Sequence, residues 1–198
     1  MVFYWRNSWL FRSFWLSCSR IQHLGKYFLA AGKGVGPMSK ERGPVTAAVR
    51  FLRENGVDFT EHSYKYVERG GTAEGARQLG LDEHLLVKTL VMEDELKRPV
   101  IVLMHGDLEV STRELARVLG VKRIGPCAPE TANKHSGYRV GGTSPFGTRK
   151  EMPVYVEETI LDLPTIYING GKRGYLLGIE PGVLSRLLKA VPVTVGIR

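Results

Sequence analysis

One lysine stands inside an otherwise apolar run of the chain. Residues 85–92 read Leu-Leu-Val-Lys-Thr-Leu-Val-Met, and their β-branched and aliphatic side chains indicate a buried strand. Side chains of a strand alternate between its two faces, so Lys88 shares a face with Leu86, Leu90 and Met92. Lysine is rarely buried without a partner, because desolvation disfavours the ammonium form. Lys88 is therefore a candidate for binding a carbonyl or phosphate oxygen; the alternative is a sheet-edge lysine that reaches water.

A glycine-rich loop is the second candidate. Residues 138–147 read Tyr-Arg-Val-Gly-Gly-Thr-Ser-Pro-Phe-Gly. Adjacent glycines allow positive φ and a close approach to a ligand. Consecutive amide N–H groups in such a turn form an anion-binding nest, which can also hold the oxyanion of an acyl transfer. Pro145 fixes part of the loop, which suits a rigid binding element and equally a plain turn.

A third segment places two cations beside glycines. Residues 169–174 read Asn-Gly-Gly-Lys-Arg-Gly, and the first three of them predict the start of a hairpin connection. Lys172 and Arg173 on such a connection can hold a phosphate, whereas the alternative is an exposed tip without a ligand.

Motifs of several common enzyme classes are absent from the sequence. It contains no G-x-S-x-G, P-loop, G-x-G-x-x-G, H-E-x-x-H or C-x-x-C pattern. His62, His84, His105 and His135 lack metal-ligand spacing, so they are expected to be structural. Cys127 reads as a small buried residue rather than a nucleophile. We therefore expect neither a metal nor a cofactor.

The elements that must position these residues follow from periodicity and turn signals. A polar turn at 93–98 makes strands 85–92 and 99–105 an antiparallel pair, and Thr72 is expected to cap its helix. The mixture of helices and strands predicts one α/β (α+β) domain with a mixed, largely antiparallel sheet. Helices are expected over 44–55, 72–79 and 111–119 and from Pro129 and Pro181, and strands over 57–66, 85–92, 99–105, 154–156, 165–168, 175–179 and 191–195.

The composition is that of an ordinary globular protein. The hydrophobic share is 43% and the charged share is 24%. No apolar run approaches the ~18 residues of a membrane span. Cys18 and Cys127 are too few for a disulfide framework. We therefore expect a cytoplasmic protein without a membrane partner.

The first 37 residues differ in composition from the rest. They hold all three tryptophans and end in a glycine-rich stretch before Met38-Ser39-Lys40. We expect residues 1–37 to lie outside the fold, as a mis-assigned start or dispensable extension, and residues 38–198 to form the domain. A transit peptide and an amphipathic surface anchor are the alternatives.

The net charge of +8 comes largely from the same segment. Residues 1–40 contain six of the 28 basic residues and no acidic one, so the remaining chain carries 22 basic and 20 acidic residues. A local excess persists between Ser111 and Lys150, where eight basic residues face only Glu114 and Glu130. Such a stretch suits a phosphate backbone, or is simply a solvated surface.

Three segments together resemble those of the YbaK/EbsC family of Cys-tRNA(Pro) deacylases, relatives of the editing domain of bacterial prolyl-tRNA synthetase. They are Leu-Val-Lys-Thr-Leu at 86–90, Gly-Tyr-Arg-Val-Gly-Gly-Thr-Ser-Pro-Phe-Gly at 137–147 and Ile-Tyr-Ile-Asn-Gly-Gly-Lys-Arg-Gly at 166–174. The resemblance covers about residues 44–194. It implies a curved mixed sheet flanked by helices, and trans-editing hydrolysis of a mischarged aminoacyl-tRNA at the acceptor end of tRNA(Pro), with prolyl-tRNA synthetase as a candidate partner.

The resemblance also assigns roles. Lys88 corresponds to the family's essential lysine, Gly141 to Pro145 to its G-x-x-x-P loop, and Tyr64 to a tyrosine near the first strand. The substrate's own thiol would attack the ester, so the protein need not supply a nucleophile. Leu176 departs from the acidic residue found in some members, which puts the amino-acid specificity in question. The expected site residues are Lys88, Gly141, Gly142, Thr143 and Ser144 as catalytic groups and Tyr64, Tyr138, Pro145, Lys172 and Arg173 as substrate-binding groups.

Three other readings stay open at the level of sequence. The same pocket suits a non-catalytic module that binds tRNA or a nucleotide. Residues 1–37 suit a membrane-associated or organelle-imported form of the deacylase. A hydrolase of free amino-acid esters would act without tRNA.

Deletion of residues 1–37 tests the predicted boundary. We expect the truncated protein to fold and to keep its deacylase activity, because the segment contributes no predicted element. Circular dichroism and a deacylation assay on both chains measure this. A truncated chain that fails to fold would show that the segment belongs to the domain.

Overall fold

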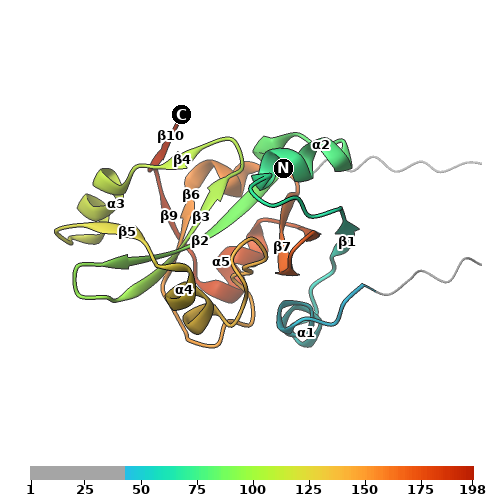
Figure 1. The fold of residues 1–198 in the computed structure, drawn as a ribbon, viewed down its shortest axis with the longest axis horizontal. Helices are drawn as coiled ribbons and strands as arrows, with labels where there is room; N and C mark the ends of the chain where they lie inside the picture. The colour runs from blue at the N-terminus through green and yellow to red at the C-terminus, as the bar shows by residue number, and fades with distance from the viewer. Residues whose placement is uncertain (1–42) are drawn as a thin grey trace, which may run out of the picture. The chain divides into compact units, whose positions relative to one another are not determined.

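The strand that carries Lys88 lies in the middle of an eight-stranded mixed sheet (Figure 1). The computed structural model describes residues 43–198, so residues 1–37 and the predicted boundary lie outside the described part. The sheet consists of β1 (Thr60–Ser63), β2 (Leu86–Asp94), β3 (Pro99–His105), β5 (Ile124–Pro126), β6 (Val154–Glu157), β7 (Ile166–Lys172), β8 (Tyr175–Ile179) and β9 (Val191–Val193). Its order is β1-β8-β7-β2-β3-β6-β9, and β5 also pairs with β2.

The pairing is mixed, as the sequence predicts. Strand β2 runs antiparallel to β3 and β5 and parallel to β7, and β7 runs antiparallel to β8. A separate antiparallel pair joins β4 (Glu109–Val110) to β10 (Gly196–Ile197). The predicted α/β class with a mixed sheet flanked by helices is therefore confirmed.

The described part contains five α-helices, and side chains cap the N-termini of two of them. The five are α1 (Ala47–Glu54), α2 (Gly71–Leu79), α3 (Thr112–Leu119), α4 (Pro129–Ser136) and α5 (Gly182–Leu188). The Thr46 hydroxyl accepts the Val49 amide at the start of α1, and Ser111 does the same for Glu114 in α3. Gly120 ends α3 in the left-handed conformation.

Alternate residues of β2 enter different cores, so both of its faces are covered. Val87 and Val91 belong to the largest core, with α1, α5 and the inner faces of β3 and β7. Met92 belongs to a second core with α3, and Leu86 to a third, small core with α2. Lys88 lies between these last two residues along the strand, where an ammonium group is least expected.

Two local predictions were wrong. Thr72 does not cap α2, whose N-cap is Gly70; its hydroxyl instead bonds the Glu83 carboxylate at 2.7 Å and the Gly106 carbonyl at 3.1 Å. Residues 169–171 do not begin the hairpin connection either. They continue β7 with an irregular register up to Lys172, and the turn is at residues 173–174. The packing explains the glycines, because a Cβ on Gly170 would lie 2.6 Å from the Tyr175 ring.

The glycine-rich loop at residues 138–147 is anchored at both ends in the main core. The Tyr138 hydroxyl donates to the Phe146 carbonyl at 2.6 Å. The Phe146 ring is fully buried and stacks on Phe51 of α1, with ring centroids 6.0 Å apart. The loop is therefore irregular in conformation but fixed to the core. None of the helices within residues 43–198 is long and apolar enough to cross a membrane.

Replacement of Phe146 tests this anchorage. We expect Phe146→Ala to lower the free energy of unfolding by about 3–5 kcal/mol, because it leaves a cavity in the main core. Val118→Ala is the control, since Val118 is 54% exposed, and should change stability by less than about 0.5 kcal/mol. Denaturant unfolding followed by circular dichroism measures both. Equal stability of the two variants would mean that the loop does not depend on the core.

Candidate functional site

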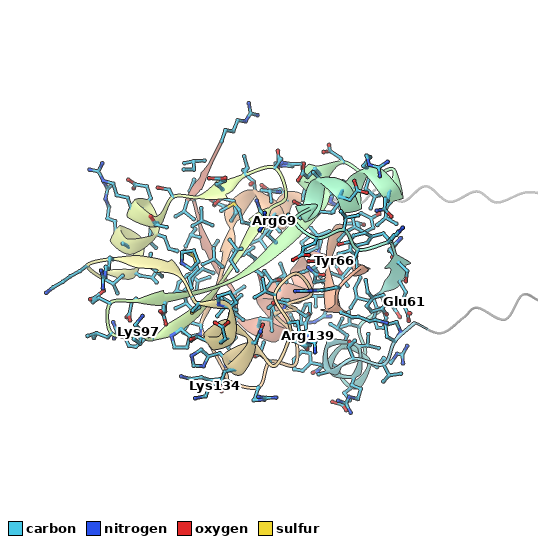
Figure 2. The ribbon with its side chains drawn as sticks, viewed as in Figure 1. Glu61, Tyr66, Arg69, Lys97, Lys134 and Arg139 are labelled. Atoms are coloured by element: carbon cyan, nitrogen blue, oxygen red, sulfur yellow. The ribbon has the colours of Figure 1, made fainter. Side chains whose placement is uncertain are left out.

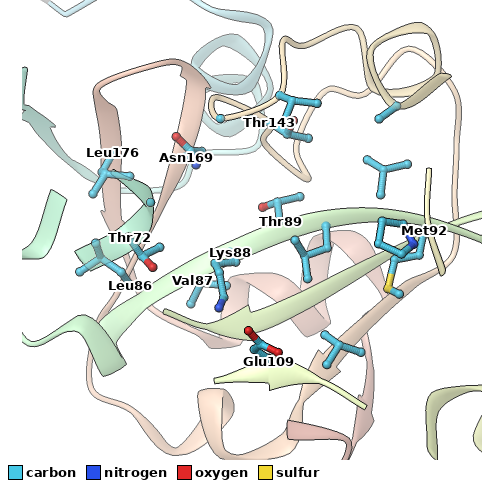
Figure 3. A pocket seen from close by; sticks show the side chains of 18 of the residues that line it. Thr72, Leu86, Val87, Lys88, Thr89, Met92, Glu109, Thr143, Asn169 and Leu176 are labelled. Carbon is cyan, nitrogen blue, oxygen red and sulfur yellow. The ribbon is translucent and has the colours of Figure 1, made fainter. Parts of the chain in front are cut away.

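A cavity of about 640 Å³ lies against β2 (Figure 3). Strand β3 pairs with β2 from Val87 to Glu93, but on the other side β7 pairs only with residues 86–87 and β5 only with residues 92–94. Residues 88–91 therefore have no neighbouring strand on that side among the described strands. The cavity is lined by residues 86–92 of β2 and by Tyr64, Tyr66, Arg69, Gly71, Thr72, Glu109, Val110, Thr112, Pro126, Cys127, Ala132, Val140, Gly141, Thr143, Tyr167, Asn169 and Leu176.

Lys88 is half-buried and lines this cavity. Its Nζ donates to the Leu108 carbonyl, and in Figure 3 it points toward the Glu109 carboxylate. Desolvation by burial lowers the pKa of Lys88, and the nearby carboxylates of Glu83, Glu109 and Asp107 oppose this effect. Lys88 lies on a central strand rather than at a sheet edge, beside the gap in the pairing of β2.

The glycine-rich loop forms another part of the cavity lining, on the side of β2 to which Thr89 points (Figure 3). Gly141, with φ +87°, and the buried Thr143 line the cavity. Gly142 faces away from it, and a Cβ there would lie 2.6 Å from the backbone nitrogen of Arg173. The loop thus packs directly on the turn that joins β7 to β8, and this contact requires glycine at position 142.

The remaining predicted residues fall into two groups. Tyr64 lines the cavity, where burial raises the pKa of its hydroxyl, and the buried Leu176 lines it as well. The other group does not line it. Ser144 and Pro145 are buried residues of the loop, and the Tyr138 hydroxyl donates its hydrogen bond to the Phe146 carbonyl. Lys172 and Arg173 are exposed. The cavity thus brings together Tyr64, Lys88, Gly141 and Thr143.

Comparison with known proteins identifies the family of this chain. Residues 69–187, more than half of the chain, match the family described as "Aminoacyl-tRNA editing domain". The chain belongs to this family. The resemblance read from its three sequence segments is therefore confirmed.

Two named proteins are similar in sequence to this editing domain. It is 29% identical over 143 residues to "Putative Cys-tRNA(Pro)/Cys-tRNA(Cys) deacylase EbsC" of Enterococcus faecalis, a match that covers 72% of this chain and 87% of that protein. It is 30% identical over 118 residues to a proline--tRNA ligase of Thermodesulfovibrio yellowstonii. That match covers 59% of this chain but only 20% of the ligase, so the similarity is to one part of the larger enzyme.

Solved structures confirm the fold. The crystal structure of "a putative trans-editing enzyme for prolyl tRNA synthetase" superimposes with a TM-score of 0.68 at 22% identity, covering 79% of this chain and all of that chain. The crystal structure of "hypothetical protein APE2540" gives a TM-score of 0.70 at 23% identity, covering 77% and 100% of the two chains.

The editing-domain cavity contains polar groups that sequence reasoning did not select. Thr89 Oγ1 and Asn169 Oδ1 are buried and have no hydrogen-bond partner within residues 43–198, and both residues line the cavity. A buried polar atom without a partner is costly, so the Thr89 hydroxyl is suited to donate or accept a hydrogen bond with a ligand, and Asn169 Oδ1 is suited to accept one. Their positions on β2 and in the irregular part of β7 gave no local sequence signal.

Arg69 is another lining residue that the sequence did not single out. Its backbone has φ +63°, which is uncommon for a residue other than glycine. Figure 2 labels it near Tyr66, and both side chains line the cavity. A cation at this position adds a second positive charge to that of Lys88.

A cluster of two histidines and an aspartate lies outside the lining of the cavity. His84, His105 and Asp107 have potential metal-ligating atoms within 4.8 Å of one another, a grouping that their sequence spacing did not reveal. His84 Nδ1 lies 2.9 Å from Asp107 Oδ1, and the His105 ring nitrogens lie 2.7 Å from the His84 carbonyl and 2.8 Å from Thr159 Oγ1. The two rings stack 3.8 Å apart at 10°, so one ion cannot lie in the plane of both. The geometry fits a support for the β3–β4 connection better than a metal site.

The thiol that lines the cavity is not an activated one. Burial, followed by the charge of Glu93, raises the pKa of Cys127 to about 11. A thiolate is the nucleophilic form of cysteine, and at neutral pH this thiol stays protonated. The prediction that Cys127 is not a nucleophile is consistent with this environment, although the residue does face the cavity.

The lowered pKa of Lys88 predicts a pH-dependent contribution to stability. The folded protein binds fewer protons at this site than the unfolded chain between the lowered pKa and about pH 10.4. Within that window, the stability of the wild type should rise relative to a Lys88→Met variant as the pH is raised. Denaturant unfolding of both proteins at several pH values between about 7 and 10 measures this difference.

Lys97→Met serves as the control for this series, because Lys97 is exposed on the turn between β2 and β3 (Figure 2). Its stability relative to the wild type should not follow the same trend. A constant difference between wild type and Lys88→Met across the window would contradict the inferred desolvation of Lys88.

Proposed function

We propose that this editing domain hydrolyses the ester of a mischarged aminoacyl-tRNA, with Cys-tRNA(Pro) as its substrate. The observation that carries the proposal is the single cavity that is lined by Lys88 of β2 and by Gly141 and Thr143 of the loop. The similarity to the Enterococcus faecalis protein, whose name specifies Cys-tRNA(Pro) and Cys-tRNA(Cys), supports the choice of amino acid and tRNA.

In this proposal the 3′ end of the tRNA enters the gap between β7 and β5. Lys88 binds a phosphate or carbonyl oxygen of the substrate through its ammonium group. The loop backbone around Gly141 and Thr143 holds the ester carbonyl as negative charge develops on its oxygen. Tyr64 contributes its half-buried ring and hydroxyl to the same pocket. Catalysis then depends on positioning and on electrostatic stabilisation.

The nucleophile in this proposal is the substrate's own thiol. Its sulfur forms a bond to the ester carbonyl carbon, the bond from that carbon to the ribose oxygen breaks, and the thiol proton passes to the ribose. The resulting cyclic thioester is hydrolysed by water to free cysteine. The protonated state of Cys127 and the complete burial of Ser144 support this mechanism, because neither is placed as a nucleophile. A substrate without a thiol would require attack by water.

The part of the cavity lining that β8 contributes is apolar. Leu176 is only 4% exposed and packs with Leu86 and Ala76 in the small core. Leucine at position 176 therefore offers no carboxylate to a substrate ammonium or thiol. This supports selection by size and polarity of the side chain, and a small side chain such as that of cysteine fits this requirement.

The partner we propose is the acceptor end of tRNA(Pro), read alone or together with prolyl-tRNA synthetase. The match to one fifth of a proline--tRNA ligase supports the link to proline, because that enzyme acts on the same tRNA. We further propose that residues 38–198 form the catalytic domain and act in the cytoplasm.

Deacylation assays on the full chain test this function. We expect Cys-tRNA(Pro) to be hydrolysed and Pro-tRNA(Pro) to be spared, with Ala-tRNA(Pro) showing whether a thiol is required. Lys88→Ala should reduce the rate constant by about 10²–10³, the usual loss when one group that stabilises an oxyanion is removed. Lys97→Ala is the matched control and should keep the wild-type rate.

Three outcomes separate the candidate functions. Hydrolysis of the cysteinyl ester by the wild type but not by Lys88→Ala supports editing with Lys88 at the site. Absence of hydrolysis of all three esters, with tRNA binding intact, supports the non-catalytic binding module. Hydrolysis of free cysteine esters at the same efficiency as Cys-tRNA(Pro) supports a hydrolase that does not use tRNA.

A further inference from the structure

A second cavity lies on the outer side of the glycine-rich loop. Its volume is about 340 Å³, and it is lined by Tyr138, Arg139, Gly142, Lys172 and Arg173 together with two further glycines. Three of these side chains are cationic and none is acidic. None of the six ion pairs formed within residues 43–198 involves any of the three cations. The second cavity is therefore a concave site of positive charge, which attracts an anion.

Arg173 is held in place between the two cavities. Its Nε donates to the Val140 carbonyl at 2.9 Å, and its guanidinium carbon lies 4.9 Å from the centre of the Tyr66 ring. Tyr66 and Val140 both line the first cavity. Because Nε is used and one face of the group is covered, these two contacts fix the direction of the outer nitrogens of Arg173.

The two cavities are lined by consecutive residues of the loop. Gly141 lines the first cavity, and Gly142 lines the second. Consecutive Cα atoms are about 3.8 Å apart, so ligand groups at these two residues are close neighbours. Gly142 packs against the backbone of Lys172 and Arg173, which fixes the cations relative to the loop. A chain molecule whose end occupies the first cavity can therefore pass over the loop into the second.

We propose that the second cavity binds a backbone phosphate of the tRNA strand that ends in the first cavity, through Arg139, Lys172 and Arg173. This inference rests on the proposed function, because it takes the 3′ end of tRNA as the occupant of the first cavity. Contacts to phosphate carry no base information, so the second cavity contributes affinity and register, and discrimination between amino acids belongs to the first.

The double variant Arg139→Gln/Lys172→Gln tests the proposal in the full chain. It removes two exposed cations and leaves Arg173, with its contacts to the first cavity, unchanged. We expect uncharged tRNA(Pro) to bind about tenfold more weakly at ~0.1 M salt. The slope of log Kd against log salt concentration should become shallower by about 0.7 for each phosphate that the variant no longer binds. Lys97→Gln/Arg186→Gln removes the same charge at exposed positions outside both cavities and should bind as the wild type does.

Hydrolysis of two esters locates the effect. With Cys-tRNA(Pro), the Arg139→Gln/Lys172→Gln variant should lose kcat/KM through an increase in KM. With the cysteinyl ester of adenosine, which has no upstream phosphate, it should equal the wild type. A similar loss with both esters would overturn the proposal, because it would place the damage in the first cavity.

The binding measurement keeps this inference separate from the proposed function. If the wild type hydrolyses neither ester, the proposed function fails, and the tRNA titration still decides whether the second cavity binds phosphate. An unchanged salt slope, or equal weakening in the control double variant, would overturn the inference. Binding of inorganic phosphate to the same variants is the last comparison. If Arg139→Gln/Lys172→Gln lost phosphate binding but kept tRNA binding, the second cavity would be a site for the free anion and the inference would be overturned.

Discussion

The interaction on which this structure depends is the contact between the Lys88 ammonium and the Leu108 carbonyl. A cation on a central strand has lost part of its water, and the carbonyl together with nearby carboxylates replaces it. The connection that carries Leu108 is itself fixed, because the Gly106 carbonyl accepts the Thr72 hydroxyl and Asp107 pairs with His84. Contacts made by α2 and by the segment that follows β3 thus fix the position of the Lys88 amine.

The glycine-rich loop, which also lines the cavity, is rigid for a different reason. Close backbone packing holds the glycine-rich loop, since Gly142 meets the backbone of residues 172–173 and the loop ends in the buried Phe146 ring. An acyl-transfer site that uses backbone groups needs such rigidity, because amide dipoles stabilise developing charge only when they do not have to reorganise. Polar and electrostatic contacts therefore hold Lys88 in place, whereas close backbone packing holds the loop.

Local sequence patterns predicted the helices and strands that form the site, but they could not predict contacts between residues far apart in the sequence. The strand at 99–105 and the cap by Ser111 were correct because alternation and capping are encoded within a few residues. Lys88 was found because its charge conflicts with its neighbours. The tie from Thr72 to Gly106 joins residues 34 positions apart, and hydroxyl chemistry alone suggested a helix cap instead. The glycines before Lys172 suggested a turn, whereas they make room for the Tyr175 ring within β7.

The gap in the pairing of β2 links the fold to the chemistry. If β7 and β5 were paired with all of β2, a strand would fill the space beside residues 88–91. The gap arises because β7 leaves β2 after Val87 and β5 joins only at Met92. The same course of β7 carries residues 172–173 beneath the loop, where they form the second cavity. The course of β7 thus leaves the gap for the ester and also places the cations of residues 172–173 beside it. In our proposal, binding of the tRNA strand in the second cavity therefore helps to position its 3′ end in the first.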